Sequence, residues 1–143
     1  MRTTLVINPK GGSGKTTIAV NLAAAFAAEG IPTTLMDYDP QGSSMNWLRL
    51  RPPHAAPIHC ANGDPERRAR LRSFASYVPR DTQRLIIVAP ARSSGMLLQE
   101  MVERAHCIVV PVVPSTIDLH ATANFLRDLV SFSCLSLLDQ YKT

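Results

Sequence analysis

A glycine-rich segment near the start of the sequence carries the residues best suited to chemistry. It reads Lys10-Gly11-Gly12-Ser13-Gly14-Lys15-Thr16-Thr17. In loops of this kind, successive backbone N–H groups turn toward a phosphate, and the helix that follows presents its positive end. Lys15 is placed to reach the terminal phosphates, and the Thr16 hydroxyl is an oxygen ligand that Mg²⁺ accepts. The segment therefore predicts binding of a nucleoside triphosphate.

The same composition could belong to a surface loop whose lysines are simply solvated. The flanking sequence argues against that alternative, because an apolar run from Thr3 to Ile7 precedes the loop and a helical pattern from Lys15 to Glu29 follows it. The segment lacks the first glycine of the pattern G-x-x-x-x-G-K-[ST], but the variant K-G-G-x-G-K-T-T fits throughout. Thr17 offers a second hydroxyl, toward the α-phosphate. A phosphate loop between a strand and a helix is the better interpretation.

Two carboxylates, Asp37 and Asp39, follow the next apolar run, Thr33 to Met36. A polar strand end before a Pro-Gly turn would favour the same residue types and needs no function. Beside a phosphate loop, paired carboxylates one strand away are better explained as a site for a metal ion and an attacking water.

Short apolar, β-favouring runs alternate with helical patterns along the chain. Strands are predicted at Thr3–Ile7, Thr33–Met36, Pro57–Ala61, Arg84–Ala89 and Cys107–Val112, and helices at Lys15–Glu29, Ser43–Leu50, Asp64–Val78, Ser94–Arg104 and Thr116–Val130. Five strands with crossover helices predict an α/β fold with a doubly wound, mainly parallel sheet. Residues Phe132 to Leu138 could either extend the last helix or cover exposed sheet.

The bulk composition fits a single folded domain over residues 1–143. Hydrophobic residues make up 45% and charged residues 18%, which excludes a disordered chain. The three cysteines are far apart and without clustered histidines, so neither a disulfide framework nor a zinc site is indicated. No export signal or membrane-spanning run is recognisable. A cytoplasmic location is expected.

Four blocks in order make the sequence resemble the ParA/MinD-type ATPases, closest to the small ParA-type partition proteins. They are the phosphate loop with its extra Lys10, the run Leu35-Met36-Asp37-Tyr38-Asp39-Pro40-Gln41-Gly42-Ser43, the strand Leu85 to Pro90, and Val109-Val110-Pro111-Val112-Val113-Pro114-Ser115 continuing to Asp118. They cover the chain from Met1 to about Val130. The resemblance implies a P-loop NTPase fold of SIMIBI-like topology.

The resemblance also implies roles for the polar residues. Lys10 would cross an ATP-dependent homodimer and neutralise phosphate charge on the partner subunit's nucleotide. Lys15 and Thr16 would hold the phosphates and Mg²⁺ of their own subunit, together with Gly11, Gly12, Ser13, Gly14 and Thr17. Asp39 would orient the attacking water, and Asp37 would lie near Mg²⁺ and its water ligands. ATP or ADP and Mg²⁺ are the implied cofactors.

Partners follow from the same resemblance. A ParB-like protein would stimulate hydrolysis, in the partition of a plasmid or chromosome. Nonspecific DNA is a further candidate, for which Arg67, Arg68, Arg70 and Arg72 form a basic run, although a solvated helix face explains that run more simply. No membrane partner is expected.

The sequence departs from the family in two places. The strand that normally ends in a Mg²⁺-positioning aspartate reads Leu85-Ile86-Ile87-Val88-Ala89-Pro90, with Val88 at the aspartate position. A valine cannot ligate a metal or orient its water, so hydrolysis is expected to suffer more than binding. The C-terminal part of the family fold, including segments that contact the adenine ring, is also expected to be missing. The alternative function is therefore a nucleotide-binding regulatory protein with little or no hydrolysis.

Overall fold

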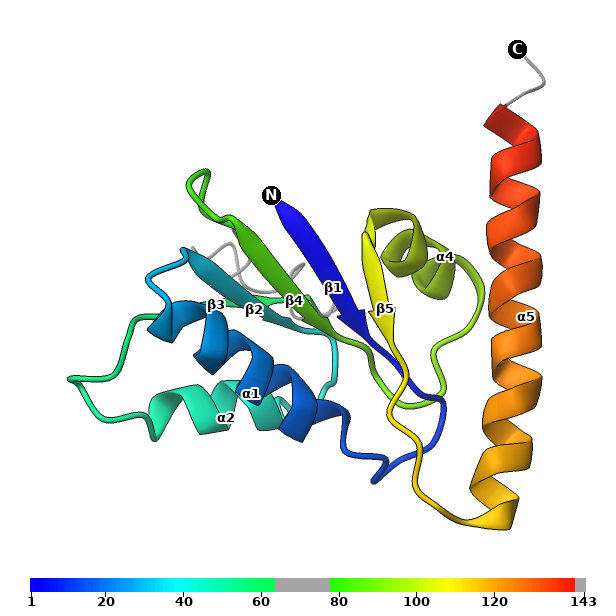
Figure 1. Cartoon of the computed structure of the whole chain (residues 1–143), viewed down its shortest axis with the longest axis horizontal. Helices are drawn as coiled ribbons and strands as arrows, with labels where there is room; N and C mark the ends of the chain where they lie inside the picture. The colour runs from blue at the N-terminus through cyan, green and yellow to red at the C-terminus, as the bar shows by residue number, and fades with distance from the viewer. Residues whose placement is uncertain (64–77, 141–143) are drawn as a thin grey trace.

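The strands of the protein form one parallel sheet whose carboxyl ends meet at a single edge. The computed structural model describes residues 1–63 and 78–140, so the predicted helix from Asp64 and the basic run within it lie outside the described residues. The strands are β1 (Arg2–Val6), β2 (Thr33–Asp37), β3 (His59–Asn62), β4 (Arg84–Val88) and β5 (Cys107–Val109). Their order is β3-β2-β4-β1-β5, with every neighbouring pair parallel. This confirms the predicted parallel α/β sheet, and its central strands β4 and β1 place their ends side by side (Figure 1).

Helices pack on both faces of the sheet. The described helices are α1 (Lys15–Ala28), α2 (Ser43–Arg49), α4 (Gly95–Arg104) and α5 (Thr116–Gln140). Because successive strand residues point to opposite faces, each central strand contributes to two cores. One core joins the sheet to α1 and α2 and includes Val6, Ala19, Val20, Ala23, Leu35, Ile86 and Val88. The other joins it to α4 and α5 and includes Leu5, Ile7, Met36, Ile87, Leu98, Met101, Phe125 and Leu129.

The last strand and the last helix differ from the predicted bounds. β5 ends at Val109 instead of Val112, because Pro111 has no N–H to donate to a ladder. α5 runs to Gln140, so the segment Phe132 to Leu138 continues the helix. Figure 1 shows α5 at the β5 side of the sheet, extending beyond it. No helix in the described ranges is both long and apolar enough to cross a membrane.

Candidate nucleotide site

The loop between β1 and α1 takes a conformation that only particular residues allow. Gly12 and Gly14 have φ of 73° and 88°, in the left-handed region that a side chain disfavours. Gly14 is also the N-cap of α1 and has no side chain to cap the helix, so the first N–H groups of α1 keep no side-chain partner there. Free amides at a helix N-terminus form an anion site. The loop therefore has the backbone geometry of an anion site.

Lys15 is drawn into this loop. Its side chain is buried, and Nζ donates to the backbone carbonyl of Lys10 over 2.8 Å and to Ser13 Oγ over 3.5 Å. Burial lowers the pKa of Lys15 below its ordinary value, and the nearby negative charge of Asp39 partly opposes that change. Within the loop the Lys15 ammonium therefore bonds to two neutral acceptors. A negatively charged phosphate oxygen would form a stronger hydrogen bond with it.

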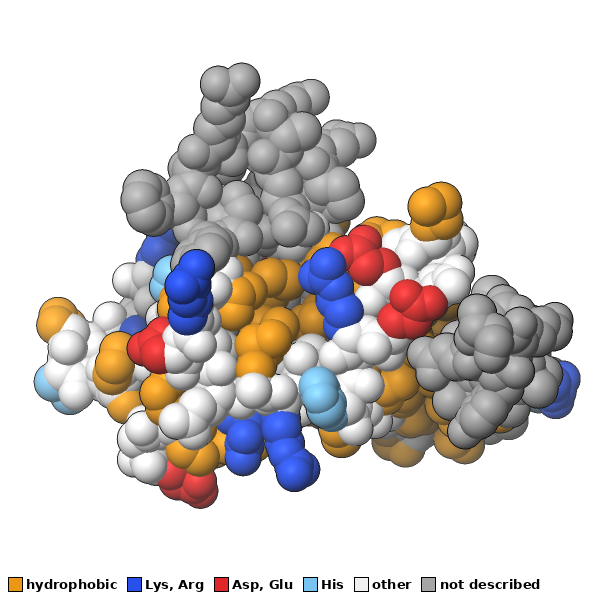
Figure 2. All heavy atoms as spheres, turned by 90° about the horizontal axis from the view of Figure 1, so that it is seen from above, with side chains coloured by type: hydrophobic (Ala, Val, Ile, Leu, Met, Phe, Trp, Pro, Cys, Tyr) orange, Lys and Arg blue, Asp and Glu red, His pale blue; other side chains and the backbone are white. Residues whose placement is uncertain are grey.

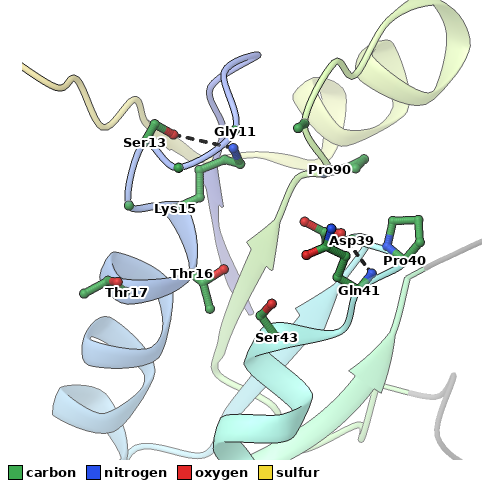
Figure 3. A pocket seen from close by; sticks show the side chains of 13 residues that line it. Gly11, Ser13, Lys15, Thr16, Thr17, Asp39, Pro40, Gln41, Ser43 and Pro90 are labelled. Carbon is green, nitrogen blue, oxygen red and sulfur yellow. Dashed lines mark hydrogen bonds between the residues drawn. The ribbon is translucent and has the colours of Figure 1, made fainter. Parts of the chain in front are cut away.

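The loop forms one wall of a cavity of about 650 Å³. The described residues that line it are Gly11, Gly12, Ser13, Gly14, Lys15, Thr16, Thr17, Asp39, Pro40, Gln41, Ser43, Pro90 and Ala91. Three segments thus meet, the loops that follow β1, β2 and β4 (Figure 3). Figure 3 shows Thr16 turned toward the space between the first two of these loops and Asp39 on its far side. The predicted phosphate-contacting residues Gly11 to Thr17 are brought together here with Asp39, whereas Lys10 is not part of the lining.

The two carboxylates after β2 have separate environments. Asp39 lines the cavity, and its Oδ1 accepts a hydrogen bond from the N–H of Gln41 over 3.0 Å. Asp37 is buried, and the cavity lining does not include it. Its carboxylate accepts from the N–H of Asp39 over 2.8 Å and from Ser44, by the N–H over 3.2 Å and the hydroxyl over 2.5 Å. The predicted pair therefore divides into one group facing the cavity and one group behind it.

Val88, the last residue of β4, is the apolar neighbour of Asp37 in the sheet. It is fully buried, and the ladder aligns it with Val6 on β1 and with Asp37 on β2. Residues aligned in adjacent parallel strands point to the same face, so the valine side chain lies beside the Asp37 carboxyl. Burial accordingly raises the pKa of Asp37, although hydrogen bonds from Ser44 and Asp39 oppose the increase.

Two polar residues to which the sequence assigned no role connect the phosphate loop to the segments that follow β5. Asn8, which is buried, donates through Nδ2 to the carbonyl of Pro111 over 2.7 Å and accepts from the N–H of Lys10 over 2.8 Å. Asp118, in the first turn of α5, forms an ion pair with Lys10. The sequence placed Asp118 only at the end of the fourth block of the family resemblance. In the structure the N–H of Asp118 donates to Ser115 Oγ over 3.4 Å.

The Lys10 side chain is half exposed, whereas Asp118 is buried. A contact between residues 108 positions apart leaves no local sequence signal, so the Lys10 partner within the chain could not have been found from the pattern. The predicted crossing of Lys10 to a second subunit stays a prediction.

The donor set around the cavity suits a magnesium ion bound mainly through phosphate. Mg²⁺ is usually held by one or two protein oxygens together with substrate phosphates and waters. The Thr16 hydroxyl and the Asp39 carboxylate are oxygen donors in the lining. Across residues 1–63 and 78–140, no three His, Cys, Asp or Glu side chains gather as a dedicated metal cage. The residues present therefore fit a metal that arrives with its nucleotide.

The chain is similar to named proteins over 46% to 82% of its length in two cases. "Maintenance of carboxysome distribution protein A" of Gloeobacter kilaueensis is 36% identical over 119 residues, which are 82% of this chain and 52% of that protein. "Chromosome-partitioning ATPase Soj" of Thermus thermophilus is 42% identical over 65 residues, which are 46% of this chain and 26% of that protein. The chain spans about half the length of the carboxysome distribution proteins it matches, 52% and 58% in two cases.

Solved structures and a family model agree on the fold. The crystal structure of cobyrinic acid a,c-diamide synthase from Mycobacterium smegmatis, with a bound ATP analogue and magnesium, matches with a TM-score of 0.68 at 24% identity, over 92% of this chain and 68% of that one. The model of the CobQ/CobB/MinD/ParA nucleotide binding domain matches residues 4–131, the range that holds the loop, both carboxylates and the start of α5. The chain belongs to the CobQ/CobB/MinD/ParA family of nucleotide-binding domains.

Proposed function

We propose that this protein is a ParA-like ATPase that binds Mg-ATP, dimerises on the bound nucleotide and acts in the partition of a plasmid or chromosome. The observation that supports it most directly is the cavity in which the loop from Gly11 to Thr17 faces Asp39. The relatives include a chromosome-partitioning ATPase and a carboxysome distribution protein, and both names support a role in positioning large cargo.

Phosphate binding rests on the loop amides and Lys15. The amides at the start of α1 stabilise negative charge through hydrogen bonds and the helix dipole. Lys15 exchanges its contact with the Lys10 carbonyl for a phosphate oxygen. Mg²⁺, when bound with the nucleotide, neutralises phosphate charge. The Thr16 hydroxyl would hold it, and the sequence-based placement of Asp37 near its waters stays a prediction.

Hydrolysis requires a positioned water, because phosphoryl transfer depends on positioning and charge stabilisation more than on covalent help. Asp39 is the carboxylate in the lining, and one of its oxygens is held by the N–H of Gln41. That hydrogen bond fixes the carboxylate on its own loop. We assign Asp39 to orienting the attacking water.

Dimerisation on ATP would use Lys10, which is half exposed at the edge of the phosphate loop. To reach a partner subunit's nucleotide, Lys10 has to leave Asp118. A second subunit, a ParB-like protein and nonspecific DNA are the proposed partners, in the cytoplasm. Figure 2 shows basic and acidic side chains interspersed among the described residues at the end of the sheet opposite to the cavity. That face offers no support for the DNA contact in the part that is described.

A second candidate function, nucleotide binding with little or no turnover, is favoured by Val88. The residue is buried beside Asp37 and offers no oxygen where the family pattern has a carboxylate. Such a protein would still bind nucleotide through the loop after β1. It would act as a nucleotide-dependent regulator.

One experiment separates the two candidates. Steady-state ATP hydrolysis is measured with Mg²⁺ and DNA for the native chain, for Val88→Asp and for Lys15→Ala as the background. Turnover above the Lys15→Ala background supports the ATPase. Turnover in Val88→Asp alone assigns the native chain to the regulatory class. Sedimentation with ATP and with ADP, on the same samples, tests the nucleotide-dependent dimer.

A further inference from the structure

Asp37 lies where the sheet meets the loop that carries Asp39. It is the last residue of β2, the residue is 2% exposed, and it is absent from the cavity lining. A buried carboxylate is costly unless its oxygens accept hydrogen bonds. The partners that it has therefore indicate what it does.

The backbone of Asp37 is fixed by the sheet. Its carbonyl accepts from the N–H of Gly63 over 2.8 Å, and the next N–H, that of Tyr38, donates to the carbonyl of Val88 over 3.0 Å. The ladder also aligns Asp37 with Val88 on the neighbouring strand. Asp37 is thus anchored to β3 on one side and to β4 on the other.

The side chain of Asp37 holds both ends of the loop that follows. Oδ1 accepts from the N–H of Asp39 over 2.8 Å. Oδ2 accepts from Ser44, through the N–H over 3.2 Å and the hydroxyl over 2.5 Å. Residues 39–43 are therefore closed into a loop around one carboxylate. Four of these five residues line the cavity.

Ser44 depends on this carboxylate for its backbone partner. It lies in the first turn of α2, where an N–H has no carbonyl within its own helix to bond. The N-cap residue, Gly42, has no side chain that could supply one. Asp37 provides the missing acceptor from seven positions upstream, and its negative charge lies at the positive end of the helix.

We propose that Asp37 is a positioning residue, which holds Asp39 and the loop 39–43 against the nucleotide cavity through its hydrogen bonds to Asp39 and Ser44. The inference rests on the proposed function and adds a role for a residue that the family resemblance places near the metal. Since the phosphate loop is anchored on other elements, loss of this contact lowers turnover more than nucleotide affinity.

The test uses Asp37→Asn and Ser44→Ala. Asp37→Asn keeps the shape but replaces one of the two acceptor oxygens with an amide donor, so the N–H of Asp39 or that of Ser44 loses its acceptor. Ser44→Ala removes the hydroxyl donor and keeps the N–H. The matched control is Thr82→Val. It removes a buried hydroxyl bond of 2.8 Å to Thr34, which lies near the other end of β2. Two quantities are measured on the full chain, native-state hydrogen exchange without nucleotide and the kinetics of Mg-ATP hydrolysis.

In Asp37→Asn, the amides of Asp39 and Ser44 are expected to exchange about tenfold faster, while those of α1 are unchanged. The kcat for ATP falls by about tenfold, with KM and the Mg²⁺ concentration for half-maximal rate unchanged. Ser44→Ala shows a smaller change of the same kind, and Thr82→Val shows neither. If Asp37→Asn does not fold, the comparison of Ser44→Ala with Thr82→Val decides.

Unchanged exchange at Asp39 and Ser44 would overturn the proposal. So would a rise in the Mg²⁺ requirement as the main effect, since that result would make Asp37 a metal-site residue. Absence of ATP binding in the native chain would refute the proposed function instead. The exchange data, which need no nucleotide, would still show whether Asp37 holds the loop.

Discussion

The loops after β1 and β4 leave adjacent strands and line the same cavity, yet they are equipped very differently. The first contains two glycines in the left-handed region, a buried lysine and hydroxyl groups. The second follows Val88 and contributes Pro90 and Ala91 to the lining, which offer no side-chain oxygen. These two lining residues can therefore contact a polar ligand only through their backbone groups.

The difference indicates that the side chains of the two loops can vary independently within one fold. Both loops end in the same place because parallel strands bring their carboxyl ends to one edge. What each loop contributes depends on a few side chains that the sheet does not determine. A chain can therefore keep the first set and lose the second without changing its architecture.

The largest effect should come from the first loop. Lys15→Ala removes the only charged side chain of the phosphate loop that lies within the described cavity lining. We expect nucleotide affinity to fall by roughly 30-fold or more, since truncating a buried charged contact costs at least about 2 kcal/mol. Titration calorimetry with an ATP analogue measures it. Arg104→Ala is the control, because its guanidinium pairs with Glu100 on α4, outside the cavity lining, and the affinity of this variant should stay close to native.

The anchoring of the first loop can be broken at Asn8. Asn8→Ala leaves the carbonyl of Pro111 and the N–H of Lys10 without their partner. We expect the free energy of unfolding to drop by about 2–3 kcal/mol, as for a buried hydrogen-bonding group that is left unsatisfied. Urea denaturation provides the measurement. Asn21→Ala, which removes an exposed hydrogen bond to Thr17, should cost less than about 0.5 kcal/mol.

A carboxylate can be introduced at the end of β4, just before the second loop. In Val88→Asp a carboxyl enters a buried position beside Asp37. Turnover with Mg²⁺ should rise by about tenfold, since the metal gains a positioned ligand. Without metal the Tm should fall, because two buried carboxylates repel each other. Val88→Thr, similar in size and uncharged, should show no gain in turnover and a smaller drop in Tm, because a buried hydroxyl without a partner costs less than a second carboxylate. Equal gains in turnover in both variants would contradict the explanation.

Nucleotide binding should be accompanied by proton uptake at Lys15, which an exposed lysine would not show. Burial lowers the pKa of Lys15 from 10.5. The negative charge of a bound phosphate should raise it again. Binding should therefore take up protons in the alkaline range below pH 10.5, and affinity should decrease as pH rises through the lowered pKa. The folding stability of the free protein changes with pH in the opposite direction. Between the lowered pKa and 10.5 the unfolded state binds more protons than the folded state, so stability rises with pH. Calorimetry in buffers of different ionisation enthalpy detects the uptake.

The smallest effect concerns strain in the second loop. Arg92 has a φ of 62°, which costs a non-glycine residue about 1–2 kcal/mol, while its N–H donates to the carbonyl of Pro9 over 3.2 Å. Arg92→Gly should stabilise the protein by about 0.5 kcal/mol after the entropic cost of glycine. Thermal unfolding tests it against Arg92→Ala, which removes the charge but keeps the strain. A similar gain in both variants would mean that charge, not φ, is responsible.

Local patterns predicted the central elements well because buried parallel strands are short apolar runs between turn residues. The bounds of β4 and β1 are within one residue of the prediction. β3 and β5 lie at the edges of the sheet and pair on one side only. Where these strands end therefore depends more on nearby prolines and loop contacts. The prediction for the end of α5 failed to choose between helix and sheet cover, since an apolar segment suits both.

The sequence by itself determined the phosphate loop, the α/β alternation and the absence of a carboxylate at position 88, because each depends on residues close together in the chain. Only the tertiary structure decided how the polar groups are paired. It set Asp37 behind the cavity and Asp39 in its lining, and it joined Lys10 to Asp118 across 108 positions. Such pairings follow from which strands are neighbours and which way a side chain points, and a linear pattern carries neither.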